Sequence, residues 1–403
     1  MSLKSKFCLL AVAALAFNVS AQFSSLNARI GAMGGTYIVD DINDVLRYAA
    51  YMNNYGDDAQ VTFNTPIIGI KSLGDMVNLG ISANRGLVLD PSFTNGFYEA
   101  ALANVNPVAE PDIANPVNIP HVLLGLNLGA VSLGFDLFCE YGRTSSSSET
   151  AAGASTEAGG LILNPGVIAS LLLGSETLPL AFKFGISVPV AKGHSETTPA
   201  AGGATTKTEV SSEGALFLEV GAEAAVPMGN FNLDLGTDFI MEKYSFETGN
   251  VDANDNTNFK TSVYAGADAK VFENGVFGIM YDFQLRSHTL TTPADAKTNT
   301  KTITQFFRTG LENVWENVWV LDKVAARGGA VWALTTPTAK ADDDAGNEGR
   351  AKAQTAVSEL IPTVGLGAGK GPFELDMTIN LGSWANGLFG GPSVGSVTAG
   401  LRF

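Results

Sequence analysis

The chain has 403 residues, with 45 glycines and 23 phenylalanines but only 16% charged residues, and its formal net charge is −16. So acidic a chain is a poor candidate for binding nucleic acid. Cys139 is the single cysteine that remains after the N-terminal leader described next, so the mature chain cannot form an intrachain disulfide.

Residues 1–21 read as a secretory signal peptide. Lys4 and Lys6 give the positive start, an apolar run follows, and small residues precede the expected cleavage after Ala21. The apolar run is about half of the ~20 residues that a transmembrane helix needs, and no later stretch is long and apolar enough to span. Loss of the two lysines takes the net charge from −16 to −18. The sequence therefore predicts an exported chain without a helical anchor.

The segment after the leader lacks the alternation seen in the rest of the chain. It contains Ala28-Arg29, Met33-Gly34-Gly35, Asp40-Asp41 and a short helical stretch. In this order it resembles the start of the outer-membrane long-chain fatty-acid transporter family and is similar to the related barrels of type IX secretion. The family's Asn-Pro-Ala is replaced here by Tyr48-Ala49-Ala50.

The resemblance implies a plug, or hatch, over residues 22–58 that lies inside a barrel over residues 59–403. Its expected plug residues are Arg29, Met33, Gly34, Gly35, Asp40 and Asp41. Arg29 and the Asp40-Asp41 pair are expected to dock on charges of the barrel lumen. The alternative is a glycine-rich leader that simply feeds the first strand, because glycine pairs also serve ordinary turns.

Most of the remaining chain alternates between apolar and polar residues with a period of two. The cleanest example runs from Leu178 to Val190, and similar segments recur, each near the ~9–11 residues of a tilted membrane strand. Short turns alternate with long polar loops, as in outer-membrane barrels whose short turns face the periplasm. The pattern predicts an all-β fold, a transmembrane antiparallel β-barrel. Serine-rich loop segments such as Ser145 to Ser148 are expected to be mobile.

The strand count is not settled by the pattern. Counting back from Phe403, a single strand from Val61 to Ile70 is the fifteenth, whereas a closed barrel of this type needs an even number. Either residues 161–173, interrupted by Asn164-Pro165, are not a simple strand, or the segment before Val61 supplies one more. Fourteen strands suit the resemblance, and sixteen remain open.

The last ten residues, 394–403, alternate strictly and end in Phe403. They resemble the closing strand of bacterial outer-membrane barrels, in which a terminal Phe is read by the barrel-assembly machinery. We expect this strand to pair with the first one, since an unpaired edge is unfavourable. The implied location is the outer membrane, with outer-membrane lipids as partners.

In a membrane barrel the apolar face of each strand contacts lipid, and the polar face lines the lumen. Acids outnumber bases on the polar face. A wide lumen of this kind would favour cations, whereas a narrow one would hold paired charges that stiffen the wall. The candidate lumen-lining residues are Asp136, Glu140, Lys183, Glu219, Glu223, Asp234, Asp238, Glu242, Asp268, Asp282, Arg286, Arg308, Lys323, Arg327, Glu374 and Asp376.

The same face carries a few apolar side chains, enough for a patch but not for an evident tunnel: Phe138, Phe217, Ile240, Tyr244, Met280 and Phe306. Trp315, Trp319 and Trp332 fit either the aromatic girdles of a membrane barrel or ordinary packing. No spacing places a Ser or an Asp with the three histidines, and no metal-ligand or phosphate-loop spacing occurs. We therefore expect no catalytic residues, no cofactor and no metal.

The predicted function is passive uptake of small molecules, hydrophobic ones included, through a plugged, acid-rich lumen. The solute itself is not specified by the sequence. The first alternative is a non-transporting barrel that serves as a scaffold or binds secreted partners through its long loops. The second, a soluble exported β-sandwich or adhesin, would bury its apolar rows in a protein core.

Overall fold

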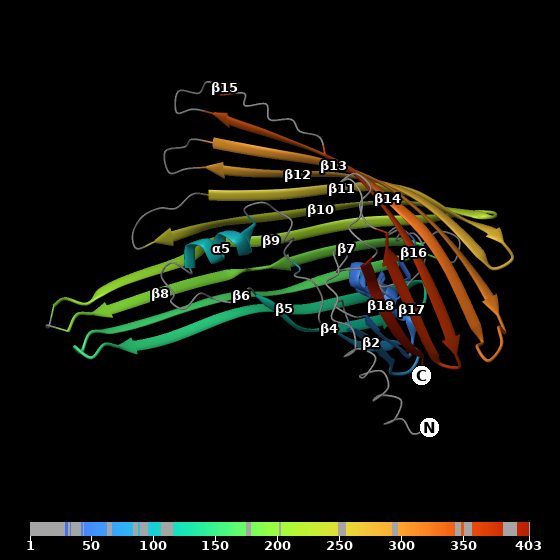
Figure 1. Ribbon diagram of the computed structural model, residues 1–403, viewed down its shortest axis with the longest axis horizontal. Coiled ribbons are helices and arrows are strands. Elements are labelled where there is room, and N and C mark those ends of the chain that lie inside the picture. The colour runs from blue at the N-terminus through green and yellow to red at the C-terminus, as the bar shows by residue number, and fades with distance from the viewer. Residues whose placement is uncertain are drawn as a thin grey trace.

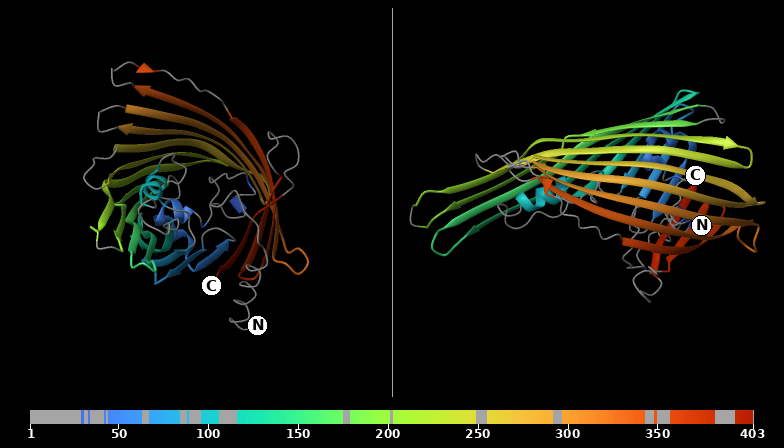
Figure 2. Two further views of the ribbon diagram at one scale, coloured as in Figure 1. Left: turned by 60° about the vertical axis from the view of Figure 1, so that its left-hand side comes forward. Right: turned by 90° about the horizontal axis from the view of Figure 1, so that it is seen from above.

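In the computed structural model the chain forms an antiparallel β-barrel with a short helical segment inside it (Figures 1 and 2). The residues that the structure describes are 29–30, 33, 42, 44–62, 67–83, 88, 96–105, 116–174, 179–200, 203–248, 255–291, 297–342, 348–349, 357–381 and 393–402. The signal peptide and Phe403 lie outside them, as do Gly34, Gly35, Asp40 and Asp41.

The helices are α3 (Asp44–Arg47), η1 (Ala49–Tyr51), α4 (Met52–Tyr55) and α5 (Phe97–Val105). The strands are β1 (Asp58–Thr62), β2 (Ile67–Ser72), β3 (Val77–Ala83), β4 (Val117–Asn127), β5 (Val131–Glu149), β6 (Ser155–Leu173), β7 (Leu180–Ser187), β8 (Val190–Thr198), β9 (Thr206–Met228), β10 (Phe231–Thr248), β11 (Asp255–Phe272), β12 (Gly275–Thr291), β13 (Lys297–Glu316), β14 (Lys323–Asp342), β15 (Glu348–Gly349), β16 (Val357–Lys370), β17 (Phe373–Asn380) and β18 (Ser393–Arg402). No helix of the described residues is both long and apolar enough to cross a membrane.

The barrel is closed by its first and last strands. β1 pairs with β18, from Asp58 opposite Arg402 to Thr62 opposite Thr398, and β1 also pairs with β2. This confirms the predicted pairing of the two ends of the chain. No edge is left at the seam, which is the condition for a sheet to survive in lipid.

The barrel wall contains sixteen strands, so the preferred count of fourteen is wrong and the open alternative is confirmed. The segments β7 and β8 form one strand, because both pair with β6 and with β9. The two-residue β15 is an extra piece that pairs with the end of β14.

The odd strand of the sequence count has a simple origin. The stretch from Val61 to Ile70 is not one strand, since β1 ends at Thr62 and β2 begins at Ile67. Asn64-Thr65-Pro66 in the sequence between them are residues that favour turns. The Asn164-Pro165 pair, in contrast, does not interrupt β6, in which Pro165 lies opposite Cys139 of β5.

The apolar rows face outward, as predicted. Phe182 and Phe184 of β7 are 42% and 50% exposed, whereas Glu219 on the neighbouring β9 is 8% exposed and faces the interior. A water-soluble sheet would show the opposite arrangement. The outward rows therefore form a lipid-facing belt, and the protein is a membrane β-barrel rather than a soluble sandwich.

The strands from β5 to β14 extend well beyond this belt, and β9 reaches 23 residues (Figure 1). On β5 the outward row changes from apolar to polar between Tyr141 and Arg143, and on β10 between Met241 and Lys243. The prediction of mobile loops is wrong for Ser145 to Ser148, because these residues belong to β5 and pair with residues 156–159 of β6. Backbone pairing orders them despite their polar composition.

Candidate functional site

The short helical segment from Asp44 to Tyr55, here called the inner segment, lies inside the barrel near its short-turn end (Figure 2). Its backbone touches the wall at a glycine. A Cβ atom placed on Gly134 of β5 would lie 2.0 Å from the backbone nitrogen of Ala50. That nitrogen donates a hydrogen bond of 2.8 Å to Ser170 Oγ of β6. The absence of a side chain at residue 134 is therefore what lets η1 sit against the wall.

Two methionines also pack closely against glycines of the wall. A Cβ atom on Gly125 of β4 would lie 2.5 Å from Met52 Cγ, and one on Gly310 of β13 would lie 2.7 Å from Met33 Cβ. Met52 also packs in a buried apolar cluster with wall residues that include Ile68 and Leu123. The inner segment thus contacts the wall closely at β4, β5 and β6, and Met33 contacts it at β13.

Arg47 anchors the inner segment to the opposite wall. Its guanidinium lies 2.6 Å from Glu223 Oε2 and donates a 2.7 Å hydrogen bond to Tyr264 Oη. Tyr51 of the same segment donates to the other oxygen of Glu223 at 2.6 Å, and Tyr264 donates to Oε2 at 2.6 Å. Both oxygens of this carboxylate are therefore engaged, and charge-assisted bonds of this kind are the stronger ones.

Arg29 makes a second ionic contact. Its Nε and one terminal nitrogen donate to the two oxygens of Glu312 at 3.0 and 2.8 Å, a bidentate arrangement. Glu312 also accepts from Arg327 of β14, which in turn pairs with Asp376 of β17. Arg29 thus joins a charge network that already contains a second cation.

Lys183 forms the centre of a third group. Its ammonium lies 2.6 Å from Glu219 Oε1 and 3.0 Å from Asp238 Oδ1, and its side chain is almost fully buried. It also lies 5.2 Å from the ring centroid of Tyr48 in the inner segment, within cation–π range. Three of the candidate residues are therefore brought together under the inner segment.

The other candidate lumen residues are distributed along the inner face. Asp282 is buried, accepts from Gln284 and lies 3.9 Å from Arg308. Lys323 pairs with Glu374 near the short-turn end, where Asp268 accepts from Asn232. Glu140 accepts from Tyr98, and Glu242 accepts from the backbone of Phe97. Asp234 and Arg286 are partly buried on β10 and β12.

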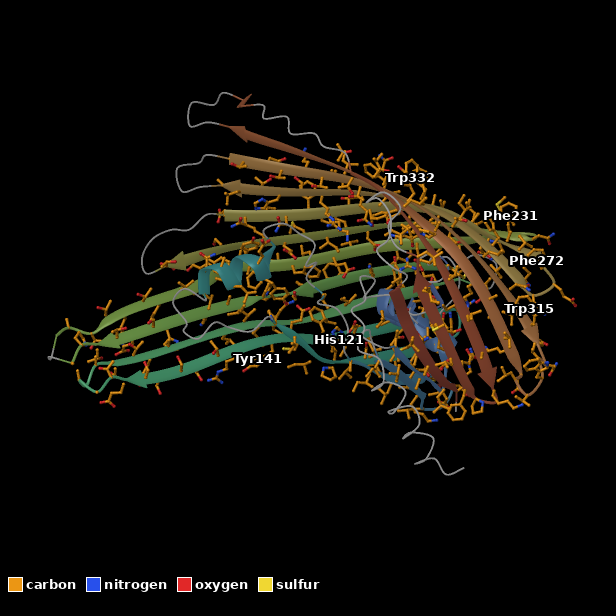
Figure 3. All side chains as sticks on the ribbon, in the orientation of Figure 1. His121, Tyr141, Phe231, Phe272, Trp315 and Trp332 are labelled. Carbon is orange, nitrogen blue, oxygen red and sulfur yellow. The ribbon has the colours of Figure 1, made fainter. Side chains whose placement is uncertain are left out.

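The structure places an acid beside His121 that no sequence spacing indicated. Its Nδ1 lies 2.7 Å from Asp136 Oδ1, both side chains are buried, and the ring stacks on Phe138 (Figure 3 labels His121). His121 and Asp136 are fifteen positions apart in the sequence. The pairing of β4 with β5 brings them together, which the spacing in the sequence alone does not reveal. The burial of both side chains indicates a structural pair within the wall.

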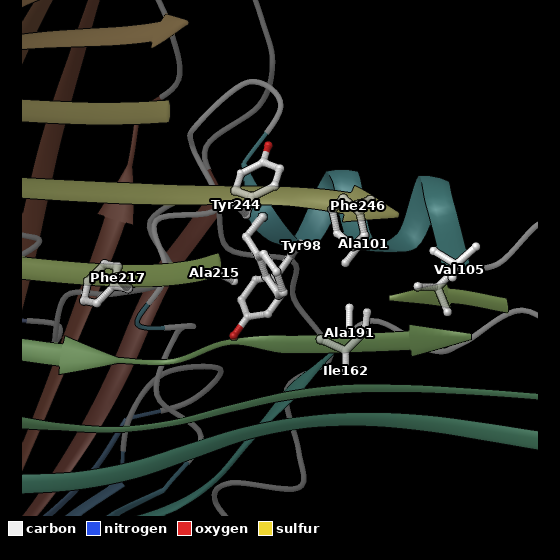
Figure 4. Packing of buried hydrophobic residues seen from close by; sticks show 11 residues of the cluster. Tyr98, Ala101, Val105, Ile162, Ala191, Ala215, Phe217, Tyr244 and Phe246 are labelled. Atoms are coloured by element: carbon white, nitrogen blue, oxygen red, sulfur yellow. The ribbon is translucent and has the colours of Figure 1, made fainter. Parts of the chain in front are cut away.

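Helix α5 builds an apolar cluster in the interior, at the edge of which the carboxylates of Glu140 and Glu242 bind Tyr98 and Phe97. Helix α5 packs Phe97 and Val105 against wall residues of β6, β8, β9 and β10 (Figure 4). Phe97 contacts Tyr244 edge-to-face at 5.6 Å and stacks on Phe246 at 5.9 Å. This apolar cluster contains Phe97, Tyr98, Ala101, Val105, Ile162, Ala191, Val210, Ala215, Phe217, Tyr244 and Phe246. The predicted patch at Phe217 and Tyr244 is part of it, whereas α5 was not anticipated from the sequence.

A cavity of about 310 Å³ lies at the short-turn end, between the inner segment and the wall. It is lined by Tyr55 and by the charged groups Arg29, Glu312, Arg327, Asp376 and Arg402. The interior therefore has an apolar cluster at α5, bordered by Glu140 and Glu242, and a cavity lined by charged groups at the short turns.

Tyr48 and Tyr51 of the inner segment are held in their protonated form. Burial, followed by the nearby carboxylates, raises the pKa of Tyr48 and of Tyr51 far above the ordinary value of a phenol. For Tyr51 the nearest carboxylate is Glu223, which accepts its proton in a hydrogen bond. In the part of the chain that the structure describes, no three His, Cys, Asp or Glu side chains are grouped as metal ligands would be.

Comparison with known proteins returns solved structures alone, since no family model and no curated protein matches the chain. The "CymD monoaromatic hydrocarbon channel" is 9% identical, with 95% of this chain and 99% of that chain covered and a TM-score of 0.41. The toluene transporter TbuX from Ralstonia pickettii is 12% identical, with coverages of 95% and 99% and a TM-score of 0.33. An outer membrane channel from Pseudomonas putida F1 is 14% identical, with coverages of 69% and 97% and a TM-score of 0.27.

By name, these neighbours are two channels and a transporter. At such low identities and TM-scores, the architecture rests on the strand pairing and on the orientation of the side chains described above. On those grounds the chain is a sixteen-stranded transmembrane β-barrel.

Proposed function

We propose that this protein is an outer-membrane channel for passive uptake of small, hydrophobic molecules, and that residues 22–58 act as its plug. The observation that carries the proposal is the division of the interior. An apolar cluster surrounds α5, away from the short-turn end. Nearer the short turns, the inner segment is bound to Glu223 of β9 and packs on Gly134 of β5. An apolar solute gains free energy by leaving water for such a cluster, at roughly 25 cal/mol per Å² of apolar surface buried.

In this scheme the solute binds first at the apolar cluster and then descends past the inner segment to the charged cavity at the short turns. The ion pair of Arg47 holds the inner segment in place between passages, and that of Arg29 holds the chain before it. The candidate lumen acids give the lower bore its polar surface, and their pairing with Lys183 and Arg327 limits the excess negative field. No nucleotide, cofactor or metal enters the scheme.

The test uses the purified protein in planar bilayers and in proteoliposomes, with and without residues 22–55. We expect solute flux of a small aromatic hydrocarbon in the full chain, and both faster flux and a larger conductance after the deletion. Phe97→Ser, placed in the apolar cluster, is expected to slow the hydrocarbon without changing ionic conductance. Absence of flux and of conductance in the full chain and in the deletion variant would exclude a channel.

A second function is favoured by one observation. Charged side chains of the inner wall are paired with one another, among them Lys183 with Glu219 and Arg327 with Asp376. A lumen filled in this way also suits a non-transporting barrel that binds a secreted partner through its tall extracellular strands. Such a protein would give no flux in either form and would retain a partner through purification from its native membrane.

A further inference from the structure

Two carboxylates of the wall hold the start of helix α5. Glu140 of β5 is fully buried and accepts hydrogen bonds from Tyr98 Oη and from the backbone nitrogen of Val88 (Figure 4 labels Tyr98). Glu242 of β10 is 2% exposed and accepts from the backbone nitrogen of Phe97 at 3.3 Å. Two neighbouring residues of α5 are therefore bound to two different strands of the barrel.

Amide side chains of the wall hold both carboxylates independently of α5. Asn164 of β6 is fully buried and donates to Glu140 Oε2 at 2.5 Å. Asn258 of β11 is also fully buried and donates to Glu242 Oε2 at 3.4 Å. Because these contacts do not involve the helix, both carboxylates keep their positions when α5 moves. Each is a fixed hydrogen-bond acceptor at the edge of the apolar cluster.

The apolar cluster is already filled by side chains of α5. Its members are at most 8% exposed, and Phe97 packs on both Tyr244 and Phe246. A solute that binds within the cluster must therefore take the place of α5 side chains. When Tyr98 withdraws, Glu140 loses one of its donors, and the loss of a donor is unfavourable for a buried acceptor, more so for a charged one.

We propose that the cluster selects aromatic solutes that carry a hydrogen-bond donor, of which a phenol is the simplest. This selectivity rests on the proposed function, which places the solute at the cluster. The ring of the solute replaces the ring of Tyr98, and its hydroxyl donates to Glu140 in place of Tyr98 Oη. A hydrocarbon of the same shape fills the same volume but leaves Glu140 without this donor. Sites with a buried hydrogen-bonding group discriminate strongly against ligands that lack the matching group.

The test is the binding of 4-fluorophenol and of fluorobenzene to the purified protein in detergent. Fluorine NMR relaxation gives the two dissociation constants, after subtraction of the signal change in protein-free micelles. We expect 4-fluorophenol to bind about tenfold more tightly than fluorobenzene, the factor for one hydrogen bond to a charged group. Equal dissociation constants, or no binding of either solute, would overturn the proposal.

Glu140→Gln removes the charge of the acceptor and keeps its shape. A neutral hydrogen bond is weaker, so the preference for 4-fluorophenol should fall to about threefold or less in this variant. A preference that stays at its original value would show that the phenol is recognised by a group other than Glu140, and would also overturn the proposal.

Tyr98→Phe tests the displacement of α5 and covers the case in which Glu140→Gln does not fold. Without the hydroxyl of residue 98, neither solute breaks a hydrogen bond on entry, so both should bind about tenfold more tightly with the preference retained. Tyr281→Phe is the matched control, because Tyr281 lies on the outward row of β12 and donates to Gln305, away from the cluster. Unchanged binding of both solutes to Tyr98→Phe would contradict the displacement.

Binding and transport can fail separately in these experiments. A preference for 4-fluorophenol in a protein that gives no flux would keep the recognition by Glu140 and exclude the channel. Flux together with equal binding of the two solutes would keep the channel and exclude the selectivity.

Discussion

Gly134 of β5 and Ala50 of the inner segment occupy the same few ångströms, since a Cβ atom on the glycine would lie 2.0 Å from the alanine nitrogen. The contact joins a segment that precedes the first strand to the fifth strand of the wall. A single methyl group added at residue 134 is therefore enough to disturb the packing of the interior.

Gly134→Ala is therefore expected to displace η1 from the wall and to break the bond between Ala50 and Ser170. Overpacking of this kind costs about 1–3 kcal/mol. Urea unfolding in lipid vesicles measures the loss, and a larger ionic conductance reports the displaced segment. Gly328→Ala on β14 is the matched control, because a Cβ atom placed there would lie 4.0 Å from its nearest neighbour. Equal stability of the two variants would show that the segment does not rest on Gly134.

The two arginines are expected to differ in their importance. Arg47→Gln leaves Glu223 with tyrosine partners only, whereas Arg29→Gln leaves Glu312 still paired with Arg327. We expect a loss of roughly 2 kcal/mol for Arg47→Gln, below the 3–5 kcal/mol of fully buried pairs because Arg47 is partly exposed, and a smaller loss for Arg29→Gln. Protease cleavage within residues 44–55 is the readout, and a reversed order of cleavage rates would contradict the asymmetry.

Lys183→Met leaves Glu219 and Asp238 facing each other without their shared cation. A buried pair broken from one side typically costs about 3–5 kcal/mol, so the melting temperature in detergent should fall markedly. The triple variant Lys183→Met, Glu219→Gln, Asp238→Asn removes the charges together and is expected to recover most of the loss. If the single and triple variants melt at the same temperature, the lysine does not balance the two acids.

Raising the pH should release the inner segment. The pKa of Tyr51 is raised in the folded protein, so its protonated form stabilises the fold. This contribution is fully present below the ordinary phenol pKa of about 10 and is lost as the pH rises above it. Absorbance at the tyrosinate band, recorded together with protease sensitivity, should show both changes together. Tyr51→Phe has no phenol at this position, and its segment should lose less stability over the same pH interval.

The fold was predictable because a strand that faces lipid on one side and the lumen on the other has apolar and polar residues at alternate positions. Phe182, Phe184 and Glu219 were assigned to the correct faces from period two alone. The number of strands was harder to predict. β1 and β2 are each too short for periodicity to distinguish them from the turn that joins them. The polar ends of β5 and β6 that meet at their hairpin were predicted to be loops. Ser and Thr occur both in loops and in strands, so the sequence does not distinguish the two until the partner strand is known.

The interior was predictable in its charge but not in its pairing. Glu223 and Asp238 were recognised as inward acids, yet their partners Arg47 and Lys183 lie 176 and 55 residues away along the chain. Such separations are set by the register of several successive strands. Glycines that accept the inner segment, such as Gly125 and Gly134, look in the sequence like any other strand glycine.

The unequal strand lengths decide what a large particle meets first at the cell surface. From Tyr141 to Glu149, β5 continues for eight residues, which at ~3.3 Å per residue adds about 26 Å of polar strand, measured along its own tilted direction, beyond the lipid boundary. Within the described residues, β17 and β18 are only 8 and 10 residues long. Large particles from outside would therefore contact the ends of the long β5–β6 and β8–β9 hairpins first, so changes there can alter recognition from outside while the interior stays the same.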